Sequence, residues 1–222
     1  MKSTFPPGEG FGRCKRQKNK LQFSVNKETF MIKTISLLPG VVLRCMQDRR
    51  FKQGCLSVQM VRLMHAGESA MNALLPSVLL RANKQYPDLR AITAQLDTLY
   101  GAAVGPIVRR IGDYQTVGLY CGFMEDRFAL PGDQILGPMI DFVREVLLNC
   151  NLENGHFLPE IVESEKKNLI ATIESERNDK RAYAMGCLLK NMCRNDSFGL
   201  PRLSEKEQVA AIDPKLLYDH YQ

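Results

Sequence analysis

The sequence lacks several features that mark large classes of proteins. It has no tryptophan, only three histidines, and no two cysteines in a C-x-x-C arrangement. The seven cysteines are odd in number and scattered, which is untypical of a disulfide framework or a zinc knuckle. We therefore expect reduced, buried thiols and a cytoplasmic protein.

Long apolar runs are also missing. The longest uncharged segment, Ser69–Leu80, is shorter than the roughly 18 apolar residues of a membrane-spanning helix. The basic N-terminus is not followed by the apolar segment of a secretory signal. No G-x-S-x-G motif occurs, and no glycine-rich loop follows a predicted strand, so common nucleophile and phosphate-binding motifs are excluded. We expect no membrane partner.

The charge is distributed unevenly. Seven basic and two acidic residues lie within residues 1–30, which therefore carry +5 of the net charge of +6. The remaining chain is nearly balanced, whereas nucleic-acid-binding domains usually gather Lys and Arg on one face, so no nucleic-acid partner is expected. Residues 1–30 are predicted to form a disordered basic extension, because they have little apolar surface to bury. The folded domain is predicted to span residues 31–222, with Met31 as an alternative start of translation.

Strand patterns dominate the first half of the domain and helical patterns the second. Apolar and polar residues alternate over 32–36, 41–47 and 55–64, which predicts a meander of three strands. A hairpin is predicted over 103–124 with its turn at Gly112-Asp113. The sequence therefore predicts an α+β fold, a mostly antiparallel sheet of about five strands packed by helices.

Helix boundaries follow from capping signals. Asp133 and Asp213-Pro214 are each predicted to start a helix, and Ser204 with Glu207 is predicted to form a capping box. Two further helices are expected over 156–178 and 181–193, and another over 89–99, with Gly101 as its C-cap. The helix that follows Gly67 carries apolar residues at i, i+3, i+4 and i+7, and Pro76 in its middle predicts a kink or an early end.

The segment from Gly67 to Pro87 resembles the zinc-binding helix of the pitrilysin/insulinase-type metallopeptidase family. In that family an inverted motif, H-x-x-E-H, precedes a Tyr-Pro pair at the helix exit. Aligned on Tyr86-Pro87, the resemblance implies that Ala73 and Ser77 stand at the two histidine positions and Pro76 at the general base. The resemblance extends from Ile32 to the end of the chain, through Gly40–Leu43, Phe51–Gly54, Leu96–Ala102, Glu163–Lys166, Phe198–Pro201 and Ile212–Pro214.

Glu165 lies within an apolar stripe that includes Val162 and Leu169, although carboxylates are seldom buried unless paired. By resemblance Glu165 matches the third zinc ligand, and Thr172 stands at a further acidic position. Alanine and proline offer no ligand atom and serine is a poor zinc ligand. We therefore expect no catalytic residue and no metal, and we expect Glu165 to face Ser77 and to bond its hydroxyl or a Lys or Arg side chain. The vestigial metal-site positions are Ala73, Pro76, Ser77 and Glu165.

The resemblance implies a non-catalytic homologue that acts as the structural or substrate-holding partner of an active zinc metallopeptidase paralogue. It is similar to a bacterial subgroup of paired insulinase-like proteins linked to modification of elongation factor P. The alternative is a zinc-dependent metalloendopeptidase that uses unidentified ligands. Expected partners are the active paralogue, a second copy of the chain, or a peptide; no cofactor is expected. The last helix has no stop signal, so we expect a truncated N-terminal domain that exposes apolar surface and self-associates.

Overall fold

A computed structural model describes residues 32–222, so the predicted basic extension and Met31 lie outside the described residues. The described chain divides into two units, the first ending at Arg49 and the second spanning Arg50–Gln222. The strands are β1 Ile32–Leu38, β2 Val41–Met46, β3 Gln53–Leu63, β4 Ala103–Ile111, β5 Tyr114–Met124, β6 Leu152–Glu153 and β7 His156–Phe157. The α-helices are α1 Ser69–Leu79, α2 Leu89–Thr98, α3 Leu136–Leu148, α4 Pro159–Ser175, α5 Lys180–Met192, α6 Lys206–Ala210 and α7 Pro214–Tyr221. Short 3-10 turns are η1 Asp126–Phe128, η2 Glu176–Asn178 and η3 Ser197–Gly199.

The first unit contains an antiparallel hairpin of β1 and β2. Ile32 pairs with Met46, and the ladder shifts register between Ser36 and Leu38. Gly40 in the connecting turn has φ +80°, a conformation that glycine adopts without steric cost.

The second unit contains a three-stranded antiparallel sheet in the order β3-β5-β4. The predicted hairpin at Gly112-Asp113 is confirmed, with Ile111 opposite Tyr114 and Gly112 at φ +60°. The predicted meander of the first three strands is wrong, because β3 pairs with β5 along its whole length, from Gln53 with Met124 to Leu63 with Tyr114. The α+β class with antiparallel sheets is confirmed, but the strands are divided among separate sheets instead of forming one sheet of five.

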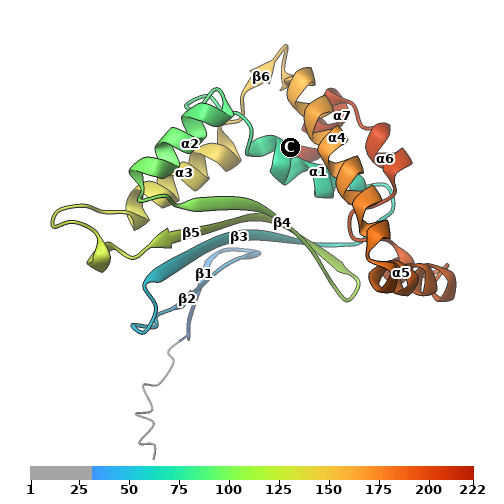
Figure 1. Cartoon of the computed structure of the whole chain (residues 1–222), viewed down its shortest axis with the longest axis horizontal. Coiled ribbons are helices and arrows are strands. Elements are labelled where there is room, and N and C mark those ends of the chain that lie inside the picture. Colours follow the sequence, from blue (N-terminus) through green and yellow to red (C-terminus); the bar gives the residue numbers. More distant parts are fainter. Residues whose placement is uncertain (1–31) are drawn as a thin grey trace, which may run out of the picture. The chain divides into compact units, whose positions relative to one another are not determined.

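Helix α1 is the centre of the second unit. It packs against β4 and β5 on one side and against α4 on the other, as Figure 1 shows. Every residue of α1 except Met71 and Ser77 is buried. The helix passes through Pro76 and ends at Leu79, three residues later, so the predicted early end is confirmed. The strand face beneath α1 supplies apolar residues such as Leu119 of β5, which belong to one core with α1 and with Phe142 of α3.

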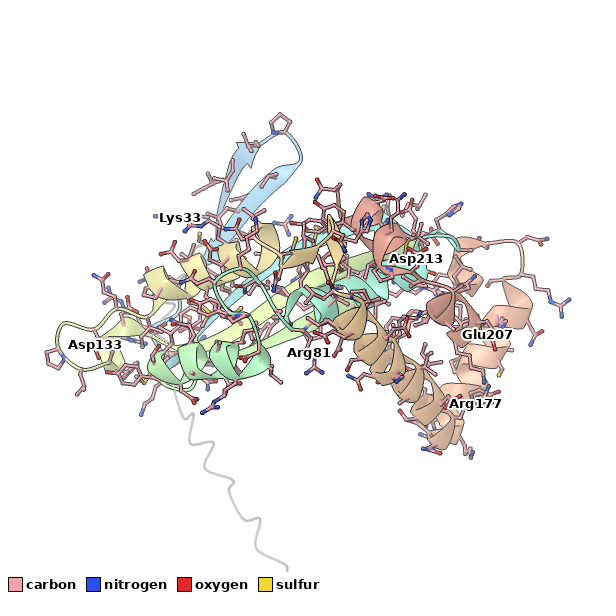
Figure 2. All side chains as sticks on the ribbon, turned by 90° about the horizontal axis from the view of Figure 1, so that it is seen from above. Lys33, Arg81, Asp133, Arg177, Glu207 and Asp213 are labelled. Carbon is pink, nitrogen blue, oxygen red and sulfur yellow. The ribbon has the colours of Figure 1, made fainter. Side chains whose placement is uncertain are left out.

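The predicted helix start at Asp133 is wrong. Asp133, in the loop before α3 (Figure 2), accepts a hydrogen bond from the Tyr100 hydroxyl instead of capping α3. The free N–H groups of Ile135 and Leu136 are bound by the carboxylate of Asp126, at 2.8 and 3.0 Å.

The predicted capping box at Ser204 and Glu207 is also absent from the structure. Helix α6 begins at Lys206, and Ser204 has φ +69° and donates its hydroxyl proton to the Gln208 side chain. By contrast, the start at Asp213-Pro214 is confirmed, since the Asp213 carboxylate accepts from the N–H of Leu216 at 2.6 Å.

The two long helices of the second half lie close to their predicted ranges. Helix α4 begins at Pro159, three residues after the predicted start, because His156 and Phe157 form the short strand β7. Helix α5 is capped by Asp179, and none of its residues is fully buried. Within residues 32–222, no helix has both the length and the apolar character that a bilayer span requires.

Candidate functional site

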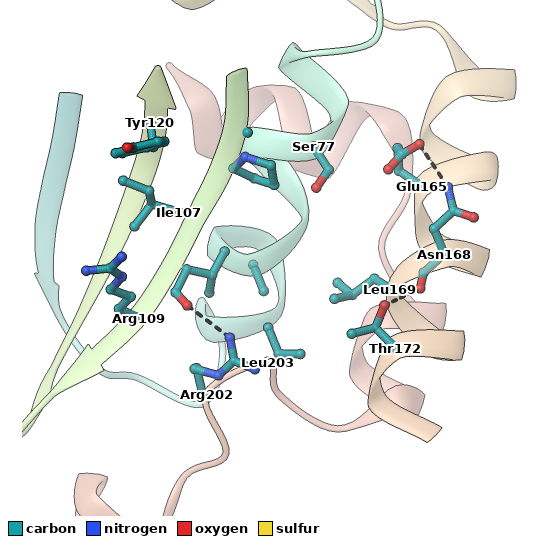
Figure 3. A pocket seen from close by; sticks show the side chains of 14 residues that line it. Ser77, Ile107, Arg109, Tyr120, Glu165, Asn168, Leu169, Thr172, Arg202 and Leu203 are labelled. Atoms are coloured by element: carbon teal, nitrogen blue, oxygen red, sulfur yellow. Dashed lines mark hydrogen bonds between the residues drawn. The ribbon is translucent and has the colours of Figure 1, made fainter. Parts of the chain in front are cut away.

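A cavity of about 510 Å³ lies between α1, α4 and strand β4. Figure 3 shows Ser77 of α1 and Glu165 of α4 directed toward each other across it, as the sequence predicted. Ala73 also lines the cavity, and Thr172 lies about two turns beyond Glu165 on the same wall. Pro76 is buried in α1 and does not line the cavity. The structure therefore brings together Ala73, Ser77 and Glu165, three of the four positions that the resemblance aligns with a metal site.

Glu165 is held by an arginine that the sequence analysis did not single out. The Glu165 side chain is 7% exposed and forms an ion pair with the Nε of Arg81, whose own side chain is 35% exposed. The amide of Asn168, one turn further along α4, donates a second hydrogen bond to the same carboxylate oxygen at 3.1 Å. Arg81 lies two residues beyond the end of α1, so helical spacing does not place it, and the fold brings its guanidinium to Glu165.

These residues do not fit a zinc ion. Ala73 and Pro76 carry no ligand atom, and the carboxylate of Glu165 is already bound to a cationic side chain. Between residues 32 and 222 no three His, Cys, Asp or Glu side chains gather closely enough to hold a metal. The guanidinium of Arg81 supplies the positive charge that the buried carboxylate requires.

A buried polar network lies at the first turns of α1. Asn72 donates to the Gln115 side-chain oxygen at 3.0 Å, and Gln115 donates to the carbonyls of Ser69 and Arg202 at 3.2 and 3.0 Å. His220 of α7 contacts the Asn72 oxygen at 2.8 Å, and its Nε2 is therefore assigned as the donor. The network joins α1, β5, α7 and the segment before α6, and the side-chain nitrogen and oxygen of both Asn72 and Gln115 have hydrogen-bond partners in it.

His220 lies at the α7 end of this network. It is half-buried, and burial lowers the pKa of its imidazole, a change opposed by the nearby carboxylate of Glu68 and reinforced by the charge of Arg62. The neutral imidazole is therefore favoured in the folded chain.

The free edge of β4 runs along the cavity. Within residues 50–222, β4 is an outer strand of the sheet, and five consecutive residues, Gly105–Arg109, line the cavity. In a hairpin with a two-residue turn, the closing pair and every second residue before it bond the partner strand. The backbone groups of Val104, Pro106, Val108 and Arg110 therefore point away from β5, and Pro106 and Val108 are among the residues that line the cavity.

Comparison with known proteins agrees with this geometry. No protein-family model matches the chain. A Bacillus subtilis protein described as a "probable inactive metalloprotease", YmfF, is 26% identical over 183 residues, which cover 82% of this chain and 43% of that protein. A conserved protein from Enterococcus faecalis has a similar structure, with a TM-score of 0.79, 25% identity, and coverage of 86% of this chain and 45% of that one.

The inactive domain of an M16 peptidase from Pseudomonas fluorescens has the same fold, with a TM-score of 0.62, 15% identity, and coverage of 86% of this chain and 43% of that one. The α+β fold therefore matches that of M16 peptidase domain halves. The chain is thus similar in sequence to a probable inactive metalloprotease and in fold to M16-type peptidase domains. The chain spans less than half the length of the relatives that it matches.

Proposed function

We propose that this domain is a non-catalytic M16-type homologue that serves as the structural or peptide-holding partner of an active zinc metallopeptidase paralogue. The observation that carries the proposal is the Arg81–Glu165 ion pair. Of the four positions that the resemblance aligns with the metal site, Glu165 alone keeps the side chain of a zinc ligand. Its carboxylate is paired with the guanidinium of Arg81 instead of a metal cation. Ala73 and Ser77 opposite it cannot complete a zinc site.

The cavity supports the peptide-holding part of the proposal. An exposed strand edge can bind an extended peptide through backbone hydrogen bonds, while neighbouring pockets receive alternate side chains. Here the edge of β4 opens onto a space of about 510 Å³ that is walled on the other side by α4. The cavity is lined by apolar residues such as Ile107 and Leu169 and by polar residues such as Asn168, so it suits a peptide with both apolar and polar side chains.

A metal and activity assay tests the proposal against its alternative, a zinc-dependent endopeptidase with unidentified ligands. We expect purified protein, dialysed against zinc, to retain much less than one equivalent of metal and to leave an unstructured casein substrate uncut. The matched control is the Glu165→Gln variant, whose metal content and casein cleavage should equal those of the unmodified chain. Stoichiometric zinc that is lost in the variant, together with cleavage, would overturn the proposal in favour of the peptidase.

The identity of the partner is tested separately. We expect co-expression with an active paralogue to yield a stable complex, and the protein expressed alone to bind an extended peptide. The link to elongation factor P modification and the cytoplasmic location stay predictions that come from the resemblance and the composition.

A further inference from the structure

The free edge of β4 is not a complete hydrogen-bonding surface. A strand that adds to it antiparallel would meet the outward backbone groups of Val104, Pro106 and Val108. Pro106 has no N–H, so it offers an acceptor and no donor, as is usual for proline on an outer strand. An added strand can therefore donate to the Pro106 carbonyl but must obtain backbone N–H donors from the neighbours of Pro106.

One of these neighbours is already occupied from within the chain. The Nη1 of Arg202 donates to the carbonyl oxygen of Val108 at 3.1 Å, as Figure 3 shows, while its Nη2 bonds the Glu176 carboxylate at 2.8 Å. The backbone carbonyl of Arg202 is fixed in turn by the buried amide of Gln115. The guanidinium is thus held from two sides at the strand edge, where it stands in for the backbone N–H of an added strand.

We propose that Arg202 is a specificity-determining residue that closes the Val108 end of the β4 edge against incoming peptide. The inference rests on the proposed peptide-holding function and deepens it. A bound strand pairs fully with Val104, donates to the Pro106 carbonyl, and finds the Val108 carbonyl taken. The ligand is therefore a short extended segment held at the Val104–Pro106 end, because the Arg202 guanidinium stands where its next N–H group would bond the Val108 carbonyl.

The test compares two lengths of one probe peptide. The probes are N-acetylated, C-amidated peptides of alternating threonine and valine with a lysine at each end, one of about five and one of about ten residues, each labelled with fluorescein. Dissociation constants come from fluorescence anisotropy with the full chain. For the unmodified protein we expect similar affinities for both lengths.

Replacing Arg202 by Met removes the guanidinium donors and keeps the apolar stem of the side chain. The long probe should then bind about two- to tenfold more tightly, the gain of one backbone hydrogen bond, while the short probe is unchanged. The matched control is Glu176→Gln, which weakens the other contact of Arg202 but leaves the guanidinium at Val108, and it should change neither affinity. Thermal unfolding of each variant checks that the fold is retained.

The possible outcomes distinguish the peptide-holding function from the role of Arg202. If neither probe binds any variant, the peptide-holding function is overturned, and the role of Arg202 with it. If the probes bind but Arg202→Met leaves the long probe unchanged, peptide holding stands and the role assigned to Arg202 is wrong. An equal gain in the Glu176→Gln control would also overturn that role, because the effect would then come from loosening the segment and not from freeing the Val108 carbonyl.

Discussion

At the scale of single residues, the two members of the Arg81–Glu165 ion pair differ in how strongly the loss of the partner destabilises them. Glu165 is almost completely buried, whereas about a third of the Arg81 side chain reaches solvent. Removing the arginine leaves a buried carboxylate with one amide donor, Asn168. Removing the carboxylate leaves an arginine that can turn into water, so the two losses are not equivalent.

This asymmetry gives the first prediction. Arg81→Met should lower the free energy of unfolding by about 2 kcal/mol, since a buried carboxylate loses a charged hydrogen bond. Glu165→Leu should leave stability nearly unchanged or increase it, because an apolar side chain fits the stripe of Val162 and Leu169. Urea denaturation of both variants and of the double variant measures the effects. Equal losses in the two single variants would contradict the argument, and a zinc-dependent rise in melting temperature would contradict the absence of a metal site.

A second prediction at this scale concerns pH. The pKa of His220 is lowered by burial, so between its folded value and the ordinary value of about 6.5 the unfolded chain binds a proton that the folded chain does not. Stability contributed by the neutral imidazole is therefore present above about pH 6.5 and is lost as the pH falls below it.

The variant His220→Gln keeps a side-chain N–H for Asn72 but cannot titrate. Its unfolding free energy should depend less on pH below about 6.5 than that of the unmodified protein, as measured by denaturation at a series of pH values. The exposed His65, whose imidazole accepts from the N–H of Gly67, provides the control variant His65→Gln. A pH dependence that is the same for all three proteins would exclude His220 as its source.

At the scale of elements, tertiary contacts replaced some of the local capping signals. Asp133 has the residue type and position of an N-cap, yet the chain between it and α3 turns so that Asp126, nine residues before Ile135, reaches the free N–H groups. Local preference for Asp at a helix start cannot distinguish these two candidates, because the bond depends on the path of the intervening loop.

The third prediction tests this assignment. Asp126→Ala should destabilise the protein by about 1–2 kcal/mol, because two N–H groups at the start of α3 lose their acceptor. Asp133→Ala removes one exposed hydrogen bond from Tyr100 and should cost less. Hydrogen exchange should accelerate at the amides of Ile135 and Leu136 in the first variant only. Faster exchange there in Asp133→Ala would return the capping role to Asp133.

At the scale of the whole molecule, the second unit exposes apolar residues on the sheet face opposite the helices. Leu63, Tyr114 and Ile111 are direct cross-strand neighbours in β3, β5 and β4, and they are 61%, 50% and 62% exposed. Contiguous exposed apolar side chains of this kind mark interaction surfaces or aggregation sites.

This row gives the fourth prediction, that the protein expressed alone self-associates through it. Sedimentation velocity should show a concentration-dependent increase in mass, and replacing Leu63 and Ile111 by Lys should abolish it while preserving the fold. The control replaces Leu148 by Lys, since Leu148 is 67% exposed at the end of α3, outside the row. A clean monomer at high concentration, or loss of association in the control alone, would contradict the prediction.

The sequence by itself determined the α+β class, the hairpin at Gly112-Asp113, the early end of α1 near Pro76 and the facing of Ser77 and Glu165. Each of these depends on periodicity, on backbone preferences within a few residues, or on a resemblance that preserves the packing of two apolar stripes. The tertiary structure alone decided that β3 pairs with β5, that Asp126 caps α3, that Arg81 neutralises Glu165 and that Arg202 occupies the edge of β4. In each case several local candidates were equivalent, and the choice depended on which distant groups the folded chain brings together. For Glu165 and Ile135 these are buried groups that require a partner.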